Sequence, residues 1–281
     1  MKSAILITGV STGIGFATAK YFLDTANWQV YGSVRKKGDA NALSTSELFH
    51  ELVFDVTDAK AKLNAINSIA ANGHDLTILV NNAGIAPSGP LEVMPRNDIR
   101  EQFEVNVFGA LETIQDALPQ LHASREKHPD IPIRIINVSS VSSILTSPFT
   151  SLYSASKASL ECLTDGFRRE LMPFNIDCVS VAPGPVKTPI WEKAMTREHI
   201  YADTKYAFVL EKLESYIKNT ETQAISANEV ASTIYHAAIA EKPKTFHLLM
   251  KKKWLIAILR RLPSRLFDKL VWKSINGEKR Y

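Results

Sequence analysis

Two side chains with complementary proton chemistry stand four residues apart in the stretch YSASK, which begins at Tyr153 and ends at Lys157. On a helix, this spacing places the phenol and the ammonium group on one face, one turn apart. Because a nearby cation favours the phenolate, we expect Lys157 to lower the pKa of Tyr153 towards neutrality. Such a tyrosine can exchange a proton with the oxygen of an alcohol or ketone. The same spacing recurs at Tyr201 and Lys205, so the surrounding sequence must decide which pair does chemistry.

The elements that would position these residues alternate along the chain. Apolar, β-rich runs cover 3–8, 28–34, 51–55, 76–81, 133–139, 175–182 and, more weakly, 245–250. Helical patterns lie near 13–25, 58–72, 98–124, 153–172 and 226–241. Near-continuous Val, Ile and Leu runs are typical of strands buried on both faces, and alternation with helices indicates a covered parallel sheet. The sequence therefore predicts an α/β protein with a doubly wound parallel sheet of about seven strands, in a single domain over residues 1–250.

The composition is that of an ordinary globular protein, since 45% of the 281 residues are hydrophobic and 22% are charged. Cys162 and Cys178 lie in apolar runs, which indicates small buried thiols rather than a disulfide or a metal site. The apolar run that follows residues 1–3 is too short for a secretion signal. We therefore expect a cytoplasmic protein without a bound metal.

Positive charge is concentrated at the carboxyl end of the chain. The net charge is +4, but residues 251–281 hold ten basic and two acidic residues, which is +8, so residues 1–250 carry 4 − 8 = −4. A mildly acidic body offers no footprint for nucleic acid. In the tail, Leu262, Leu266 and Leu270 recur among basic residues, which predicts an amphipathic helical segment too short in apolar residues to span a bilayer. This tail could contact an anionic membrane peripherally, or dock on its own domain or on a second subunit.

A glycine-rich loop follows the first predicted strand, in the stretch TGVSTGIG from Thr8 to Gly15. Gly9 would allow the tight turn, Gly13 the close approach of a ligand, and Gly15 the packing of the helix on the strand. The amino terminus of that helix then offers free N–H groups to a pyrophosphate. The loop predicts a dinucleotide-binding site.

Further motifs follow this loop in a fixed order: NNAG at residues 81–84, Ser140 thirteen residues before Tyr153, and PG at residues 183–184. With the spacing TGxxxGxG, the pattern over residues 3–190 resembles the short-chain dehydrogenase/reductase family, including its retinol- and 17-beta-hydroxysteroid-dehydrogenase-like members. Tyr153 occupies the position of the family's catalytic tyrosine, whereas Tyr201 follows the last cofactor-binding strand and has no serine placed upstream. The resemblance implies a Rossmann-type fold and hydride transfer between a nicotinamide cofactor and an alcohol or carbonyl carbon.

The resemblance also implies roles for individual residues. Tyr153 would be the general acid in reduction and the base in oxidation, and Lys157 would lower the tyrosine pKa and bind the nicotinamide ribose. Ser140 would bind the substrate oxygen, and Asn106 would support a water-linked proton relay to the lysine. The other implied cofactor contacts are Gly9, Ser11, Thr12, Gly13, Ile14, Gly15, Arg35, Asp55, Val56, Asn82, Ala83, Gly84, Pro183, Gly184, Val186 and Thr188. For Asp55, an alternative interpretation is an N-cap of the next helix.

The residues that end the second predicted strand bear on the choice of cofactor. An NAD enzyme typically has a carboxylate there, which holds the ribose hydroxyls. This chain has Val34 instead, followed by Arg35, Lys36 and Lys37. Because the planar guanidinium of Arg35 can bind a 2′-phosphate, the pattern favours NADP(H). NAD(H) is the alternative, since the glycine loop has Thr12 where many NADP-dependent members have a basic residue.

Residues 190–222 follow the Pro-Gly motif, where the family usually builds its substrate lid. The large apolar side chains of this segment are Trp191, Met195, Ile200, Tyr201, Tyr206, Phe208 and Leu210. They fit a lipophilic alcohol or ketone of the steroid, retinoid or fatty-chain type, although packing on the domain or on a partner subunit would explain them equally well.

Three functions are consistent with these patterns. The leading hypothesis is an NADP(H)-dependent oxidoreductase that interconverts a lipophilic alcohol and its carbonyl compound. The main alternative is a catalytically silent NADP(H)-binding regulatory or scaffold protein on the same fold, and the third is an isomerase or epimerase with a bound cofactor. The presence of all four implied catalytic residues favours the first. Family members are often dimers or tetramers built through the helices expected near 98–124 and 153–172, so we expect a homodimer or homotetramer.

Overall fold

Seven parallel strands form one sheet in the computed structural model, which describes residues 3–25, 28–188, 198–207 and 224–276. The strand order is β3-β2-β1-β4-β5-β6-β7. The strands are β1 (Ser3–Ile7), β2 (Gln29–Val34), β3 (Phe49–Val53), β4 (Asp75–Asn81), β5 (Arg134–Val138), β6 (Asp177–Pro183) and β7 (Phe246–Leu249). All seven predicted strands are confirmed, and their bounds differ from the expected ones by one or two residues.

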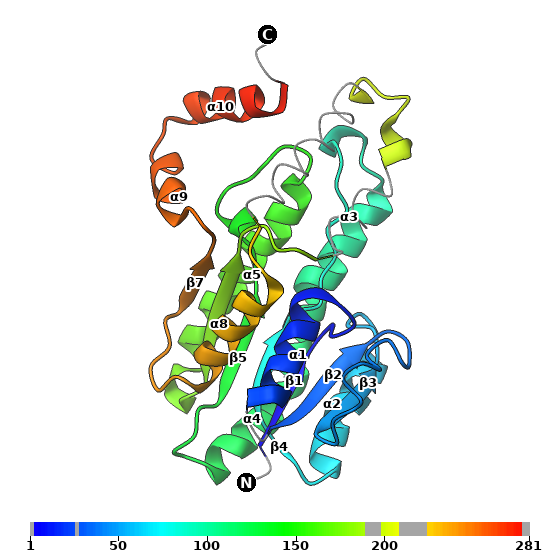
Figure 1. Cartoon of the computed structure of the whole chain (residues 1–281), viewed down its shortest axis with the longest axis vertical. Helices are drawn as coiled ribbons and strands as arrows, with labels where there is room; N and C mark the ends of the chain where they lie inside the picture. Colours follow the sequence, from blue (N-terminus) through cyan, green and yellow to red (C-terminus); the bar gives the residue numbers. More distant parts are fainter. Residues whose placement is uncertain (1–2, 26–27, 189–197, 208–223, 277–281) are drawn as a thin grey trace.

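Helices cover both faces of this sheet (Figure 1). One face carries α1 (Gly13–Thr25) and α8 (Ala227–Ile239), and the other carries α2 (Ala59–Ala71), α4 (Gly109–Lys127) and α5 (Ser151–Glu170). The predicted doubly wound α/β arrangement of the Rossmann type is therefore confirmed.

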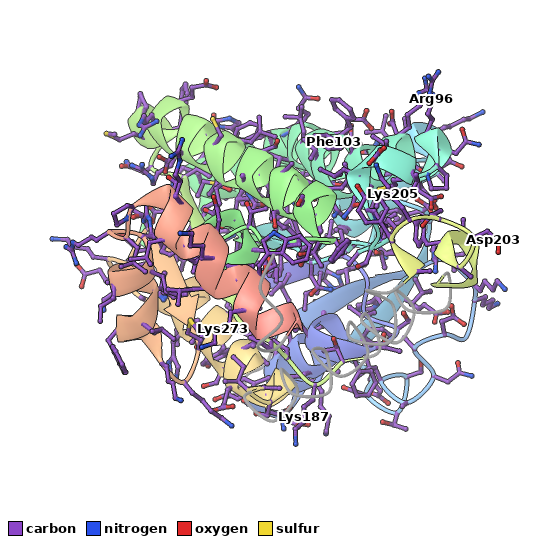
Figure 2. The ribbon with its side chains drawn as sticks, turned by 90° about the horizontal axis from the view of Figure 1, so that it is seen from above. Arg96, Phe103, Lys187, Asp203, Lys205 and Lys273 are labelled. Atoms are coloured by element: carbon purple, nitrogen blue, oxygen red, sulfur yellow. The ribbon has the colours of Figure 1, made fainter. Side chains whose placement is uncertain are left out.

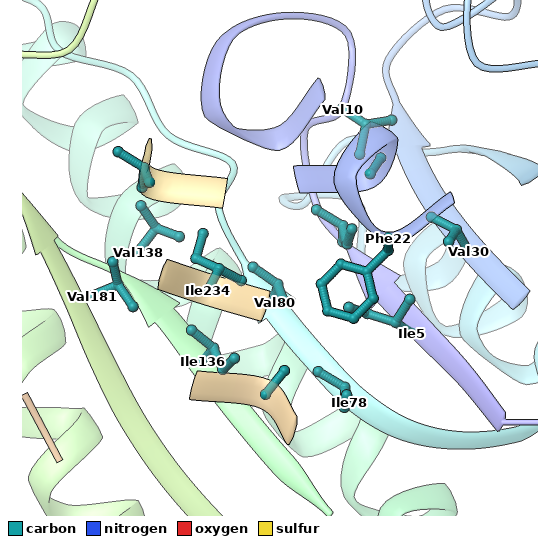
Figure 3. Packing of buried hydrophobic residues seen from close by; sticks show 14 of the residues in the cluster. Ile5, Val10, Phe22, Val30, Ile78, Val80, Ile136, Val138, Val181 and Ile234 are labelled. Atoms are coloured by element: carbon teal, nitrogen blue, oxygen red, sulfur yellow. The ribbon is translucent and has the colours of Figure 1, made fainter. Parts of the chain in front are cut away.

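Each face of the sheet has its own apolar core, because successive strand residues point to opposite sides. Ile5 belongs to a buried cluster with Phe22 of α1 and Ile234 of α8, which Figure 3 shows between the strands and these helices. Leu6, the next residue of β1, belongs to the second cluster with Ile66 of α2. This burial on both faces explains why the strands read as continuous apolar runs.

The helix that the sequence predicts over 98–124 is interrupted. It consists of α3 (Arg96–Phe103), a π-helical turn (Glu104–Phe108) and α4. Asn106 lies in this turn, where its amide donates to the carbonyl of Ile85 and accepts from the N–H of the same residue, both at 2.9 Å. The wider turn therefore ties the helix to the loop that follows β4, as π-helical turns often do near functional sites.

The carboxyl-terminal tail forms two helices after β7, α9 (Lys253–Leu259) and α10 (Ser264–Asn276). They lie beyond the tip of β7, at the end of the molecule towards which the strands point (Figure 1). Ile256 is buried, whereas Trp254, Leu266, Leu270 and Trp272 are exposed. None of the helices in the described ranges is long and apolar enough to cross a membrane.

One expectation about the cysteines is wrong. Cys178 is buried in β6, but Cys162 is exposed on α5. The apolar residues that surround Cys162 in the sequence belong to a helix, so they turn towards the sheet while Cys162 lies on the opposite face.

Candidate active site

The carboxyl ends of the central strands border a cavity of about 300 Å³. It lies where the strand order reverses, between β1 and β4, which is the usual ligand position in an open α/β sheet. Of the residues singled out from the sequence, the cavity is lined by Gly9, Ser11, Thr12, Gly13, Ile14, Arg35, Asp55, Val56, Asn82, Ala83, Gly84, Ser140, Tyr153, Lys157, Pro183, Gly184, Val186 and Thr188. Gly15 and Asn106 do not line it but support its walls from behind.

The glycine loop has the backbone geometry that its sequence predicts. Gly9 and Gly13 have φ angles of +73° and +63°, in the left-handed region that favours glycine. A Cβ at Gly15 would collide with the backbone oxygen of Gly9 and with the side-chain amide of Asn82. That amide donates to the backbone oxygens of Thr8 and Gly9, at 2.9 and 3.1 Å. The NNAG motif therefore holds the loop in place, and Gly15 leaves room for this contact.

The cavity residues fit a dinucleotide. Helix α1 begins at Gly13, so its first N–H groups, which have no helical partners, are available at the loop. Phe54, Val56 and Val105 supply apolar wall beside them, and Arg35 is exposed at the rim. This combination of free N–H groups, apolar wall and a cation matches a pyrophosphate, a base and a further phosphate.

The structure brings Ser140, Tyr153 and Lys157 together. Tyr153 and Lys157 are buried one turn apart on α5, and the side chain of Ser140, just after β5, is hydrogen-bonded to the phenol. Lys157 Nζ lies 5.8 Å from the centre of the tyrosine ring and donates to the carbonyl of Val138 at 2.9 Å. Asn106 lies behind them, and its amide donates to Ser156 Oγ at 3.0 Å as well as to Ile85. The four residues thus form one connected cluster at the carboxyl end of β5.

The expected lowering of the tyrosine pKa is not found in this structure. Burial raises the pKa of Tyr153 to about 12, and the hydrogen bond to Ser140 lowers it only in part. Burial also lowers the pKa of Lys157 to about 8, against the attraction of the Glu161 carboxylate. The prediction considered the charge of the lysine alone, whereas the loss of hydration is the larger effect on both groups.

The second Tyr–Lys pair lies elsewhere. Tyr201 is buried against Gly89, where a Cβ would collide with its phenol. Lys205 pairs with Glu92 at 2.9 Å, and Figure 2 shows it on the side of the molecule where α3 and Arg96 lie. Neither residue of this pair lines the cavity.

The predicted lid is only partly within the described residues. Trp191, Met195, Phe208 and Leu210 lie outside them. Tyr206 is described: its hydroxyl donates to Glu92 at 2.6 Å, and its ring packs against Phe149. Phe149 itself is buried with φ +66°, an unusual value for a non-glycine residue.

Sequence reasoning missed several lining residues, namely Ser33, Phe54, Thr57, Ile85, Glu101, Val105, Val138 and Ser139. Ser33 and Ser139 adjoin predicted strand ends, so strand position alone could have indicated them; Ser33 Oγ accepts from the N–H of Gly9 at 3.0 Å. Nothing in the sequence distinguishes Glu101 or Val105. The alternative role of Asp55 as a helix cap is wrong, because Asp58 caps α2. Asp55 instead accepts from the N–H and hydroxyl of Thr57.

The sequence matches a family model over most of its length. The model, described as "short chain dehydrogenase", matches residues 3–199, so the chain belongs to the short-chain dehydrogenase family. The resemblance expected from the motifs is therefore confirmed, and the chain is an NAD(P)-dependent oxidoreductase.

Individual relatives cover nearly the whole chain. The NADPH-dependent 3-dehydrocapnine reductase of Ornithobacterium rhinotracheale is 37% identical over 98% of both chains. The 3-ketodihydrosphingosine reductase of Bacteroides thetaiotaomicron is 27% identical over 85% of this chain and 84% of its own. A solved structure of ElxO with NADP bound is 26% identical, with a TM-score of 0.71, over 89% of this chain and 96% of its own.

Proposed function

We propose that this protein is an NADPH-dependent reductase that converts the ketone of a lipophilic, chain-bearing substrate into a secondary alcohol, with Tyr153 as the general acid. The observation that carries the proposal is the buried hydrogen bond between Ser140 and Tyr153, at the wall of a cavity that also holds Lys157 and the glycine loop. Two hydroxyl groups that converge on one point can both bind a carbonyl oxygen there.

The proton chemistry of these residues suits a reduction. With its pKa raised to about 12, the Tyr153 phenol is protonated at neutral pH, which is the form that a general acid needs. Ser140 donates to the substrate oxygen and stabilises its developing negative charge. Lys157 is the cation that favours the phenolate left after proton transfer. When bound, the nicotinamide cofactor supplies the hydride.

The cofactor is NADP(H), with Arg35 as the group that holds the 2′-phosphate. Arg35 lies exposed at the cavity rim after β2, and no carboxylate occupies the end of that strand. A guanidinium can bind the phosphate with two parallel hydrogen bonds. The relative from Ornithobacterium rhinotracheale is NADPH-dependent and ElxO binds NADP, which supports this choice.

The substrate class is a 3-oxo compound with a fatty chain. Two relatives are a 3-dehydrocapnine reductase and a 3-ketodihydrosphingosine reductase, whose names both describe an oxidised position 3. In the described part of the predicted lid, Tyr206 supplies a half-buried aromatic ring, which packs against Phe149. A long apolar chain can bury its surface against such side chains.

We further propose that the tail, residues 251–281, docks on an anionic membrane surface. Trp254, Leu266, Leu270 and Trp272 expose large apolar groups on α9 and α10. The basic side chains around them are all exposed: Lys251, Lys252, Lys253, Arg260, Arg261, Arg265, Lys269 and Lys273. Concentrated positive charge beside exposed Trp and Leu is complementary to anionic lipid, and it would keep a cytoplasmic enzyme close to a lipid-soluble substrate.

Vesicle sedimentation tests the tail proposal. Because each basic residue near an anionic surface contributes about 1 kcal/mol, the charge reversal K269E/K273E should weaken binding to anionic vesicles by at least about tenfold. The matched reversal K242E/K244E, at exposed lysines outside the tail, should leave binding unchanged. If K269E/K273E binds anionic vesicles as tightly as K242E/K244E does, the contact does not depend on charge. The same conclusion follows if the wild type binds neutral and anionic vesicles equally.

For the assembly, we propose a homo-oligomer built through α4 and α5. Phe108, just before α4, and Cys162, on α5, are both exposed. Light scattering after size-exclusion chromatography gives the mass directly, and a charged substitution at Phe108 should reduce it to that of one chain.

The reductase proposal is tested by following NADPH absorbance with a substrate panel. Three ketones are compared: a 3-oxo compound with a long chain, the same 3-oxo compound with a short chain, and a steroid ketone. We expect kcat/KM to be highest for the long-chain compound and higher with NADPH than with NADH. Faster turnover of the short-chain or steroid ketone would overturn the substrate class, while the enzyme class would stand.

A further inference from the structure

A carboxylic acid continues the catalytic face of α5. Tyr153, Lys157 and Glu161 follow one another at intervals of four residues, so the three side chains lie on one face of the helix. Glu161 lies between α5 and β6, where its carboxylate accepts a hydrogen bond from the Ser180 hydroxyl at 2.7 Å. Its burial raises its own pKa, and the hydroxyls of Ser139 and Ser180 oppose this rise. The carboxylate is therefore held by a residue of β6.

The buried lysine needs a negative charge nearby. Lys157 is 4% exposed, and its ammonium donates to a neutral group, the carbonyl of Val138. A buried cation without a counter-ion loses its proton readily. Its other neighbours, namely Tyr153 on α5, Asn106 in the π-helical turn and the backbone of Gly84, carry no formal charge.

The charged groups around this pair are few. Glu161 is the charge that favours the protonated form of Lys157. Asp165, one turn further on α5, acts on Glu161, but it is half-exposed and paired with Arg168 and Arg169. The carboxylate also faces the hydroxyl of Ser139, which follows β5, and the hydroxyl of Ser180 in β6.

We propose that Glu161 is a positioning residue of the active site, whose carboxylate, held by Ser180 of β6, keeps Lys157 protonated. The role is to maintain the cation, not to touch the substrate. This proposal rests on the proposed function in one respect, which is the catalytic role of Lys157. The isosteric variant Glu161→Gln keeps the hydrogen-bond acceptor for Ser180 and removes the charge.

The titration of Lys157 itself provides the test, without substrate or cofactor. Protein labelled with 13C at lysine Cε is titrated by NMR, and the Lys157 signal is assigned by its loss in Lys157→Arg. The wild-type midpoint is expected near 8, and Glu161→Gln should lower it by about one pH unit, the usual effect of a close opposite charge. Asp165→Asn, a matched loss of a carboxylate on the same helix, should leave it unchanged. An unchanged midpoint in Glu161→Gln overturns the proposal.

A second variant and the pH dependence of turnover test the same role of Glu161. If Glu161→Gln does not fold, Ser180→Ala removes a hydrogen bond that favours the ionised carboxylate. The midpoint of Lys157 should then fall, and no movement overturns the proposal. In turnover, Glu161→Gln should move the basic limb of the kcat profile to lower pH by the same shift. If no ketone is turned over by the wild type, the proposed function fails, while the NMR result still decides the role of Glu161.

Discussion

The ammonium of Lys157 is anchored on the carbonyl of Val138, at 2.9 Å, and Val138 is the last residue of β5. The next residues of the chain are Ser139 and Ser140, so one hydrogen bond connects the helix that carries the tyrosine and lysine to the strand end that carries the serine. The relative position of the three proposed catalytic groups is therefore fixed by the sheet itself. Changes at these groups should act on catalysis, and changes at their supports should act on binding or stability.

The contact between Gly15 and Asn82 predicts a local defect when a methyl group is added. In Gly15→Ala, the new Cβ would collide with the Gly9 oxygen and the Asn82 amide, which must displace the glycine loop. We expect the NADPH dissociation constant to rise by about tenfold or more and the melting temperature to fall. Gly166→Ala, also a helical glycine but with open space around it, should instead stabilise the protein by about 0.5–1 kcal/mol. Equal effects of the two variants on NADPH binding would contradict this interpretation of the loop.

Arg35 should discriminate between the two cofactors. Because a hydrogen-bonded charge pair contributes about 1.5–3 kcal/mol, Arg35→Ala should weaken NADPH binding about ten- to a hundredfold while NADH binding stays the same. Lys37→Ala, two residues further on and outside the cavity lining, serves as the control. Binding titrations with both cofactors measure this, and an unchanged preference in Arg35→Ala removes that residue from the specificity argument.

Lys62 is completely buried on α2 and should support, from behind, the cavity wall that follows β3. Its ammonium donates to the carbonyl of Val56, a cavity residue, at 3.0 Å, and to Glu112 of α4 at 2.7 Å. Since Glu112 is partly solvated, Lys62→Met should cost about 1–3 kcal/mol of unfolding free energy, mainly through the lost hydrogen bonds. It should also raise the NADPH dissociation constant. Lys60→Met, at an exposed position of the same helix, should change neither; urea denaturation and binding titration distinguish the two variants.

A stacked pair of rings predicts how stability depends on pH. His50 lies on the ring of Tyr31, with 4.5 Å between ring centres, and burial, with a smaller contribution from His74, lowers the pKa of His50 below its ordinary value of 6.5. The unfolded chain therefore binds a proton before the folded one as the pH falls. Unfolding free energy should decrease as the pH drops below about 6.5. Urea denaturation at pH 7.5 and 5.5 measures the decrease, which should be smaller in His50→Gln. An equal decrease in that variant would assign the effect to other groups.

The sequence predicts those structural elements that depend on residues close together in the chain. Buried strands appear in the sequence as continuous apolar runs. The glycines indicate the backbone geometry of the loop, and the Tyr–Lys spacing follows the period of a helix. The π-helical turn at Asn106 has no such signal, because it depends on the bond to Ile85, a contact distant in the sequence. The burial of Glu161 and Lys62 depends in the same way on strands and helices elsewhere in the chain. The Tyr–Lys spacing predicts the wrong direction for the Tyr153 pKa, because burial and charge oppose each other and only packing sets their balance.

The central claim is that Tyr153, and not the equally spaced Tyr201, transfers the proton. NADPH oxidation with the long-chain 3-oxo substrate is compared for wild type, Tyr153→Phe and Tyr201→Phe, with NADPH affinity measured in parallel. Because a positioned general acid contributes about 10²–10⁴-fold, Tyr153→Phe should lower kcat by this factor and leave NADPH affinity within about twofold. Tyr201→Phe should keep kcat close to the wild-type value. Turnover that survives in Tyr153→Phe, or is lost only in Tyr201→Phe, would contradict the account.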